Sequence, residues 1–291
     1  MKQTTLARVA RTIDAPIMLE GEGFEVRRPV PARGLEAVGP FIMLDHLGPV
    51  TYAPGEAKGA PTHPHAGIET LTYLIEGTAR HLDSLGNASI MGPGDAQWMR
   101  AGSGIIHDEG ADDAFQKSGG VYHGVQLWLN MPKGRRGEPP AYRQIDANEM
   151  ATFQLGDATV RLIAGGLDGR VGPLETHTDP FLARVTLPAN GRMTLAPTAD
   201  ELAVYLLLGT ARVDVTEAVQ GRLLVLEGGG NIEIQAGGDG ADLLIVGGPR
   251  LDAPIVRYGP FVMNTEAELV VAINAYNAGR FGRIQREGVS A

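Results

Sequence analysis

Two pairs of residues in the first half of the chain have the types and spacing of metal ligands. The segment THPHAG places His63 and His65 two residues apart, and IIHDEG places His107 and Glu109 in the same relation. Side chains at i and i+2 of a β-strand point to one face, so each pair offers two ligands on one side while Asp108 turns away. Two such strands side by side would converge four ligands on one point. Imidazole with carboxylate suits iron, manganese, nickel, copper or zinc, and four ligands leave up to two octahedral positions open for chemistry.

The amino-acid composition argues against several kinds of metal site and several classes of protein. The 291 residues include no cysteine, which excludes disulfides, thiolate metal sites and cysteine nucleophiles. The formal net charge is −9, so the surface disfavours direct binding to nucleic acid. No apolar run reaches the length of a membrane span, and the N-terminus lacks the apolar core of a signal peptide. We therefore expect a soluble cytoplasmic protein with no membrane association.

The elements that would position these ligands are short strands. Glycine is abundant, with 40 residues, and the apolar runs are brief and bounded by Gly, Pro, Asp or Asn. Strands that recur this closely indicate an all-β sandwich or barrel. Examples are TLTYLIEGTARHLDS, GVQLWLNM, ATVRLIAGG, FLARVTL, LAVYLLLGTARVDV and GADLLIVGG.

One helix is predicted near the C-terminus. Thr265 and Glu268 have the spacing of a capping box, in which each side chain bonds an otherwise unpaired amide. Leu269, Ile273 and Tyr276 then fall on one face, and Gly279 is placed to end the helix. This pattern is typical of a helix that packs on the body of its own chain.

The sequence contains an internal repeat. YLIEGTAR at 73–80 returns as YLLLGTAR at 205–212, and PGDAQWMRAG at 93–102 pairs with GGGNIEIQAG at 228–237. Similar segments in the same order at nearly constant spacing indicate a duplicated domain. We predict an N-terminal metal-binding domain, 1–138, and a degenerate C-terminal domain, 139–291. The boundary is placed in the polar, proline-rich stretch 131–144, which has the composition of a linker.

The repeat provides an internal control for the metal site. The offset between the first two repeated segments carries His63 and His65 onto Leu195 and Pro197. The offset between the second two carries the other pair of ligands onto an aspartate at 242 and a leucine at 244. The ligand set is therefore complete in the first half only, which predicts one metal per chain.

The other histidines are interpreted as structural before any role in binding is considered. His46 and His123 stand in segments that also carry the family resemblance described next, so a place beside the site stays open for them. His81 and His177 show no such signal. Trp98, Trp128 and Met99 are expected in the core, and Arg100 on the surface.

Several segments together resemble the pirin family of the cupin superfamily. They span nearly the whole chain and are specific in combination. The resemblance implies a bicupin, that is, two tandem antiparallel β-barrels of jelly-roll type with a C-terminal helix. The matching segments are GPFIMLDHLGP (39–49), HPHAGIETLTYLIEG (63–77), DSLGN (83–87), PGDAQWMRAGSGIIHDE (93–109), HGVQLW (123–128) and PIVRYGPFVMNTEAEL (254–269).

The resemblance also implies roles for particular residues. The equivalents of His63, His65, His107 and Glu109 hold one divalent metal in pirins, usually iron as Fe(II). Glu69 occupies a position that is a ligand in many cupins but not in pirins. The position five residues after the motif proline, where a typical cupin has its later ligand histidine, is a tryptophan here. The resemblance therefore assigns that role to the histidine of the second pair.

Three functions are compatible with an open metal site in a barrel. The resemblance implies a quercetin 2,3-dioxygenase, in which a flavonol ring is opened with O₂ and Glu109 acts as the catalytic base. A second interpretation is a regulatory protein whose metal state tunes its binding to a transcription factor or metabolic enzyme. A third is an isomerase or hydrolase, because cupins host many chemistries. We favour the dioxygenase, with a small aromatic flavonol and O₂ as its partners.

Overall fold

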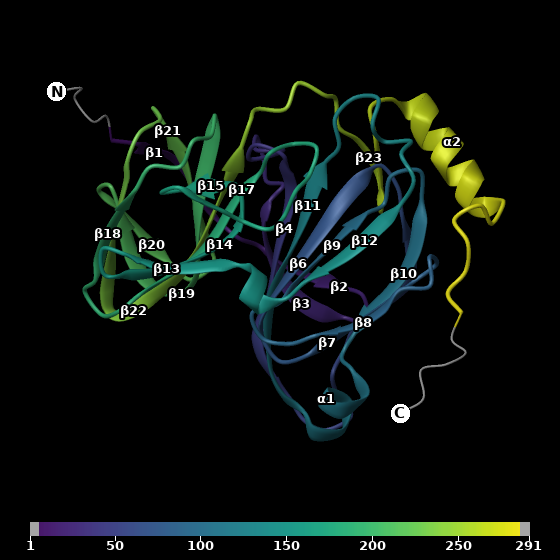
Figure 1. Cartoon of the computed structure of the whole chain (residues 1–291), viewed down its shortest axis with the longest axis horizontal. Coiled ribbons are helices and arrows are strands. Elements are labelled where there is room, and N and C mark those ends of the chain that lie inside the picture. The colour runs from purple at the N-terminus through teal and green to yellow at the C-terminus, as the bar shows by residue number, and fades with distance from the viewer. Residues whose placement is uncertain (1–5, 286–291) are drawn as a thin grey trace. The chain divides into compact units, whose positions relative to one another are not determined.

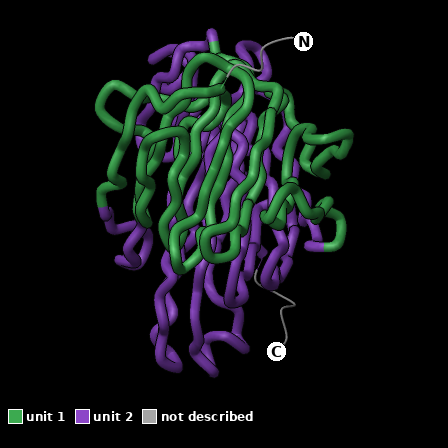
Figure 2. Tube along the Cα trace, turned by 90° about the vertical axis from the view of Figure 1, so that its left-hand side faces the viewer, with its two compact units in different colours: residues 1–16, 27–44, 148–251 green, residues 17–26, 45–147, 252–291 purple. Residues whose placement is uncertain are grey.

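The computed structural model describes residues 6–285, and nearly all of its regular structure is antiparallel β-strand (Figure 1). The chain divides into two compact units, each assembled from separated segments (Figure 2). Within the described residues, the first unit contains residues up to Pro16, Arg27–Leu44 and Asn148–Leu251, and the second contains Ile17–Val26, Asp45–Ala147 and Asp252 onward. The expected all-β class is confirmed. The predicted domains 1–138 and 139–291 stay a prediction about the duplicated halves, whereas the compact units take segments from both halves.

The first unit is built on one nine-stranded sheet. Seven strands form the main path, and β18 and β20 pair with β22 and β19 beside it. The path runs β1 (Arg8–Asp14), β21 (Arg222–Glu227), β19 (Glu201–Val213), β22 (Ile232–Gly248), β17 (Phe181–Leu187), β14 (Ala158–Ala164) and β13 (Ala151–Leu155), and the side strands are β18 (Arg192–Leu195) and β20 (Thr216–Val219).

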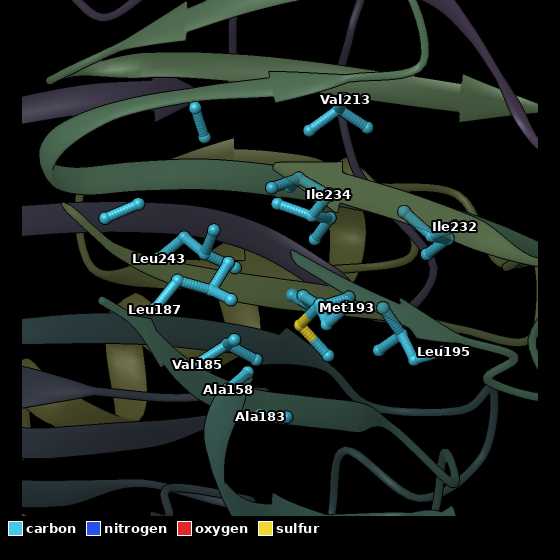
Figure 3. Packing of buried hydrophobic residues seen from close by; sticks show 14 of the residues in the cluster. Ala158, Ala183, Val185, Leu187, Met193, Leu195, Val213, Ile232, Ile234 and Leu243 are labelled. Carbon is cyan, nitrogen blue, oxygen red and sulfur yellow. The ribbon is translucent and has the colours of Figure 1, made fainter. Parts of the chain in front are cut away.

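Aliphatic side chains fill the interior of this first unit. Val185, Met193, Leu195, Ile234 and Leu243 are each less than a twentieth exposed and pack in one cluster (Figure 3). Burying such a continuous apolar set removes it from water and is the main driving force for folding. The interior described here therefore offers an apolar core and no group of metal ligands.

The second unit is built mainly on two sheets, and side chains of the larger one contact Glu109 on the smaller one. The larger sheet runs β12 (Ala141–Ile145), β9 (Ala96–Arg100), β6 (Ile68–Glu76), β11 (Gly120–Asn130), β4 (Phe41–Tyr52), β3 (Phe24–Val30) and β2 (Ile17–Glu20), with the first part of β4 and the last of β3 assigned to the first unit. The smaller sheet runs β5 (Ala60–His65), β10 (Ile105–Gly110), β7 (Ala79–Asp83) and β8 (Ala88–Met91).

Equivalent glycines support the internal repeat. Gly77 and Gly209, which occupy the same place in the two repeated segments, adopt φ of 89° and 78°. A side chain would be strained there, which explains glycine in both copies. Tyr73 and Tyr205, four residues earlier, are both fully buried. The repeated sequence thus places a positive-φ glycine and a buried tyrosine at the same positions in each unit, although Gly77 lies between β6 and β7 and Gly209 lies within β19.

The predicted C-terminal helix is confirmed as α2 (Glu266–Asn277). The capping box between Thr265 and Glu268 is formed, and the Gly279 N–H donates to the carbonyl of Tyr276. Leu269 lies in an apolar cluster that includes Phe261 and Phe281, with Ile273 packed against it. The remaining short elements are α1 (Asp113–Ser118), a 3₁₀ turn (Ala147–Glu149) and the strand pairs β15 (Gly166–Leu167) with β16 (Arg170–Val171) and β23 (Val256–Tyr258) with β24 (Phe261–Met263).

The proline-rich stretch 131–144 is integrated into the second unit. Its last residues belong to β12, and Arg136 is only 4% exposed. The Arg136 guanidinium donates to the side-chain oxygen of Asn264 at 3.0 Å and to the carbonyl of Val262 at 3.0 Å. This stretch therefore fastens the C-terminal segment, although its composition is that of a linker.

Among residues 6–285, no helix is both long and apolar enough to cross a membrane.

Candidate metal centre

The four predicted ligands lie on two neighbouring strands of the second unit. His63 and His65 are on β5, and His107 and Glu109 are on β10. The two strands pair antiparallel, with His107 directly opposite His63. Pro64 is accommodated in β5 opposite Ile106. Strand pairing thus brings the two motifs together as their spacing predicts.

Three imidazoles converge. The Nε2 atom of His63 lies 3.1 Å from that of His65 and 2.8 Å from that of His107. His65 and His107 are almost completely buried, while His63 is partly exposed. The three residues form one of the two groups of potential metal-ligating side chains in the described chain.

Backbone carbonyls orient two of these rings. Nδ1 of His63 lies 2.8 Å from the carbonyl oxygen of Pro61, and Nδ1 of His65 lies 3.3 Å from that of Pro260. Since a carbonyl can only accept, each Nδ1 carries the proton and each Nε2 keeps a lone pair. This is the tautomer that a metal-binding histidine needs, with the second nitrogen fixed by a hydrogen bond.

Burial keeps two of these rings neutral. It lowers the pKa of His65 to about 3, helped by the neighbouring His63, and it lowers the pKa of His107 well below the ordinary value. Desolvation penalises the charged form of imidazole, so both rings are neutral at physiological pH. Neutral imidazole is the form that coordinates metal ions.

Glu109 lies beside this cluster rather than within it. Its Oε2 is 3.9 Å from Nδ1 of His107, on the far edge of that ring from the three Nε2 atoms. The reason is a register shift: from His107 to Glu109 the chain advances two residues on β10 but three on β5. Against β7 the register is regular, so Glu109 stands opposite His81. The structure therefore brings together three of the four predicted ligands and places the fourth next to one of them.

Two glutamine amides hold the Glu109 carboxylate. Nε2 of Gln97 donates to Oε1, and Nε2 of Gln126 donates to Oε2 at 2.8 Å. Gln97 and Gln126 stand on either side of Thr72 in the larger sheet, on β9, β11 and β6. Residues that are directly opposite on adjacent strands share a face, so this row points as a unit at Glu109. Both carboxylate oxygens are thus satisfied by neutral donors.

Tyr142 supports this row from β12. Its hydroxyl donates to Oε1 of Gln97 at 3.3 Å, which directs the Gln97 NH₂ group toward Glu109. Its ring stacks on His81, with centroids 4.3 Å apart and planes 13° from parallel. Burial raises the pKa of Tyr142 to about 12, so its hydroxyl stays a neutral donor.

His81 is the residue of this region that sequence reasoning missed. It forms a second group of potential ligands with His107 and Glu109. Its Nε2 is 3.2 Å from Oδ2 of Asp83, and its Nδ1 is buried with no hydrogen-bond partner. Only the pairing of β7 with β10 places it opposite Glu109, and no spacing in the sequence shows that pairing.

Asp108 turns away from the imidazoles, as strand alternation predicts. Its Oδ2 accepts from the backbone and hydroxyl of Thr62 at 3.1 and 3.0 Å, and its Oδ1 pairs with Arg80 at 3.1 Å. Asp108 therefore ties β10 to its two neighbours in the smaller sheet.

The remaining candidates lie elsewhere. His46 and His123 are buried with their Nε2 atoms 2.8 Å apart. A register shift between His123 and Gly124 interrupts the alternation of β11, and His123 stands opposite Glu76 of β6. Glu69 belongs to neither group of potential ligands in the described chain. Trp128, expected in the core, presents its ring edge-on to His65 with centroids 5.0 Å apart.

In the first unit, Leu195 stands opposite Ile232, in the same relation as His63 to His107 in the second unit, and the aspartate given by the sequence offset forms an ion pair. Asp242 accepts two hydrogen bonds from Arg184, at 2.9 and 2.7 Å. Leu195 is part of the apolar core. The loss of the ligand set predicted for this half agrees with these contacts.

The donor set of the second unit fits a non-thiolate metal. Nε2 of His63 and Nε2 of His65 both keep lone pairs and lie 3.1 Å apart, so neither can donate to the other, and Nδ1 of His107 is buried without a hydrogen-bond partner. Such a concentration of unsatisfied acceptors is costly unless a cation binds it. A carboxylate within reach adds negative charge. The cluster can therefore hold a metal ion.

Comparisons with known proteins agree along most of the chain. Family models described as Pirin and as Pirin C-terminal cupin domain match residues 23–129 and 182–282. A Pseudomonas aeruginosa protein that carries a provisional quercetin 2,3-dioxygenase name is 36% identical, over 90% of this chain and 94% of its own.

Solved structures show the same fold. Quercetin 2,3-dioxygenase from Acinetobacter baumannii superposes with a TM-score of 0.90 at 31% identity, covering 97% of this chain and 100% of the other. A bacterial pirin from Escherichia coli in complex with nickel(II) gives a TM-score of 0.64 at 23% identity, covering 82% and 99%. The predicted bicupin fold is confirmed.

Proposed function

The chain belongs to the pirin family, and we propose that it is a metal-dependent dioxygenase that opens a flavonol ring with O₂, as quercetin 2,3-dioxygenase does. In that reaction the flavonol takes up O₂, the central ring opens to an ester, and carbon monoxide leaves. The observation that carries the proposal is the convergence of three imidazoles, two of them held neutral by burial, beside a carboxylate that can accept a proton. The likeness to a solved quercetin 2,3-dioxygenase over nearly the whole chain supports the choice of substrate.

His63, His65 and His107 would hold the metal, with Glu109 as the fourth ligand. Iron as Fe(II) is our proposed metal, with nickel as the alternative suggested by the nickel(II) complex of a bacterial pirin. When bound, the metal supplies Lewis acidity that lowers the pKa of a coordinated hydroxyl. The protein supplies fixed, neutral nitrogen ligands, because burial holds His65 and His107 in the unprotonated state.

Glu109 would accept the proton of the flavonol 3-hydroxyl. A general base must lie within hydrogen-bonding distance of the proton it takes, and its amide partners define where this carboxylate stands. The amides of Gln97 and Gln126 cannot accept that proton from Glu109 in turn, so it stays on the carboxyl oxygen during the ring opening. Trp128, edge-on to His65, contributes an apolar surface suited to flat aromatic rings.

A turnover assay tests the proposal. Protein stripped with a chelator and reloaded anaerobically with Fe²⁺ is mixed with quercetin in air, and both loss of flavonol absorbance and release of carbon monoxide are measured. We expect both signals from the loaded protein and neither from the stripped protein. If protein loaded in turn with Fe²⁺, Mn²⁺ and Ni²⁺ leaves quercetin unchanged, the dioxygenase proposal is wrong. Metal-dependent retention of a transcription factor or metabolic enzyme would then support the regulatory alternative.

A further inference from the structure

Hydrogen bonds to the Glu109 carboxylate would compete with its binding to a metal ion. A carboxylate that is to bind a metal needs a free oxygen lone pair directed at it, yet both oxygens of Glu109 already accept hydrogen bonds from amides. Thr72 also lies within 3.5 Å of Oε1. The carboxylate is on the Nδ1 side of His107, while the imidazole lone pairs converge on the Nε2 side.

We propose that Gln97 and Gln126 form a clamp that holds Glu109 away from the three imidazoles, so that Glu109 is the exchangeable ligand of the site and the clamp lowers its affinity for metal. The three histidines are the permanent ligands. This inference rests on the metal site of the proposed function and concerns how that site is regulated by its neighbours.

The clamp is built into the larger sheet rather than being a chance contact. Gln97, Thr72 and Gln126 are directly opposite one another on three adjacent strands, so the backbone ladder fixes their spacing. Glu109 reaches this row from the smaller sheet. The Tyr142 hydroxyl occupies the Gln97 carbonyl oxygen, and this bond leaves the NH₂ group directed at the carboxylate.

Glu109 would have a different role in each of its two positions. In the clamped position it keeps its charge satisfied by two donors, and it can accept a substrate proton there without contact with the metal. To reach a metal on the Nε2 side the carboxylate would have to leave the Nδ1 side of His107, which would weaken its bonds to the two amides. The clamp therefore sets the balance between Glu109 as a ligand and Glu109 as a base, and Gln97 and Gln126 are positioning residues for that exchange.

Affinity for Ni²⁺ measured by calorimetry on the full chain tests this inference. Gln97→Met and Gln126→Met keep the side-chain length and remove the donor. Each variant is expected to lower the Kd for Ni²⁺ by about tenfold. This factor corresponds to the loss of one hydrogen bond to the charged Glu109 carboxylate in the position where it does not bind the metal. Because Gln126 is partly exposed and Gln97 is buried, the two variants perturb packing to different degrees and serve as independent tests.

Two controls separate the clamp from a merely structural effect. Gln144→Met removes the next amide in the same row, which donates to Ile90 and Asp146 instead of Glu109, and it should leave the affinity unchanged. In a Glu109→Gln background, removing either clamp residue should also have no effect on Ni²⁺ affinity.

Weaker or unchanged binding in both clamp variants overturns the inference, as does tightening that persists without the Glu109 carboxylate. If the parent protein takes up no Ni²⁺, both the clamp and the metal site are wrong. If the pattern is as expected but flavonols are not turned over, the clamp stands and the dioxygenase function fails.

Discussion

Replacing His65 by glutamine is expected to change the pH dependence of folding stability in a defined direction. In the metal-free protein, burial holds the pKa of His65 at about 3, against an ordinary value of 6.5. Below pH 6.5 the unfolded chain therefore binds a proton that the folded protein does not. Through linkage, this one residue lowers the free energy of unfolding by about 2 kcal/mol between about pH 8 and pH 5. His107, whose pKa burial also lowers, acts in the same direction.

Glu69 opposes this effect. Burial raises its pKa to about 7 from an ordinary 4.5, while Trp98 and Arg100 favour the charged form only in part. The folded protein therefore binds a proton as the pH falls through 7, before the unfolded chain does. This raises the free energy of unfolding by about 2.5 kcal/mol between about pH 8 and pH 5. The two contributions to the free energy of unfolding offset each other in the parent protein. Removing one of them by substitution should therefore expose the pH dependence that the other causes.

The assay is urea unfolding of chelator-treated protein at pH 8, 7, 6 and 5. Both tryptophans of the chain, Trp98 and Trp128, lie in the second unit, so their fluorescence reports on the unit that contains the site. Relative to the parent, His65→Gln should gain stability on going from pH 8 to pH 5, and Glu69→Gln should lose it. Glu76→Gln, at an exposed carboxylate of the same strand as Glu69, should follow the parent. If His65→Gln keeps the parent profile, the argument that this imidazole is buried neutral is refuted.

Three further predictions concern the metal and the chemistry. Elemental analysis of anaerobically purified protein should find one transition metal per chain, with metal–nitrogen distances of about 2.0–2.2 Å by X-ray absorption, and two tightly bound metals would contradict the loss of ligands in the first unit. His63→Ala should abolish Ni²⁺ binding while leaving the far-UV circular dichroism unchanged, because this side chain is partly exposed and the apolar cores carry the stability; an unfolded spectrum would show that the cluster is structural. Glu109→Gln, compared at equal metal occupancy, should slow flavonol turnover by about 10²–10⁴-fold, the usual contribution of a general base, whereas Glu76→Gln should not; near-normal turnover would remove Glu109 from the mechanism. Asp108→Asn is unsuitable as the control because Asp108 pairs with Arg80.

Much of the fold was predictable because its signals are local. The C-terminal helix follows from a capping box and a terminating glycine, all within the short segment 265–279. The repeated segment keeps a glycine with positive φ in both copies, at Gly77 and Gly209. The three imidazoles follow from two-residue spacing on strands, provided the strands are neighbours. Each of these inferences depends on geometry that a short segment determines by itself.

The position of Glu109 could not be predicted in the same way. Equal spacing in the two motifs implies that all four side chains meet, but a register shift between β5 and β10 moves Glu109 level with His81. The clamp residues Gln97 and Gln126 are far apart in the sequence and meet only because β9 and β11 both pair with β6. Register and strand order are properties of the assembled sheet, and one sequence shows neither. The same limit applies to the stretch 131–144, where composition indicates a linker but Arg136 has buried partners.

The two units carry the same repeated segment, but only one of them contains the residues of the proposed metal site. Both carry a positive-φ glycine and a buried tyrosine in the repeated segment, and both have strands whose buried and exposed residues alternate. In the first unit the core cluster is apolar, and Ile232 stands opposite Leu195 where His107 stands opposite His63 in the second unit. In the second unit the inward positions supply unsatisfied imidazole lone pairs and a row of amides. An apolar interior stabilises the chain, whereas the polar interior costs stability until a cation binds it. Because the metal site is confined to one unit, the other unit keeps an intact apolar core. The chain can therefore remain stable although one of its interiors is polar.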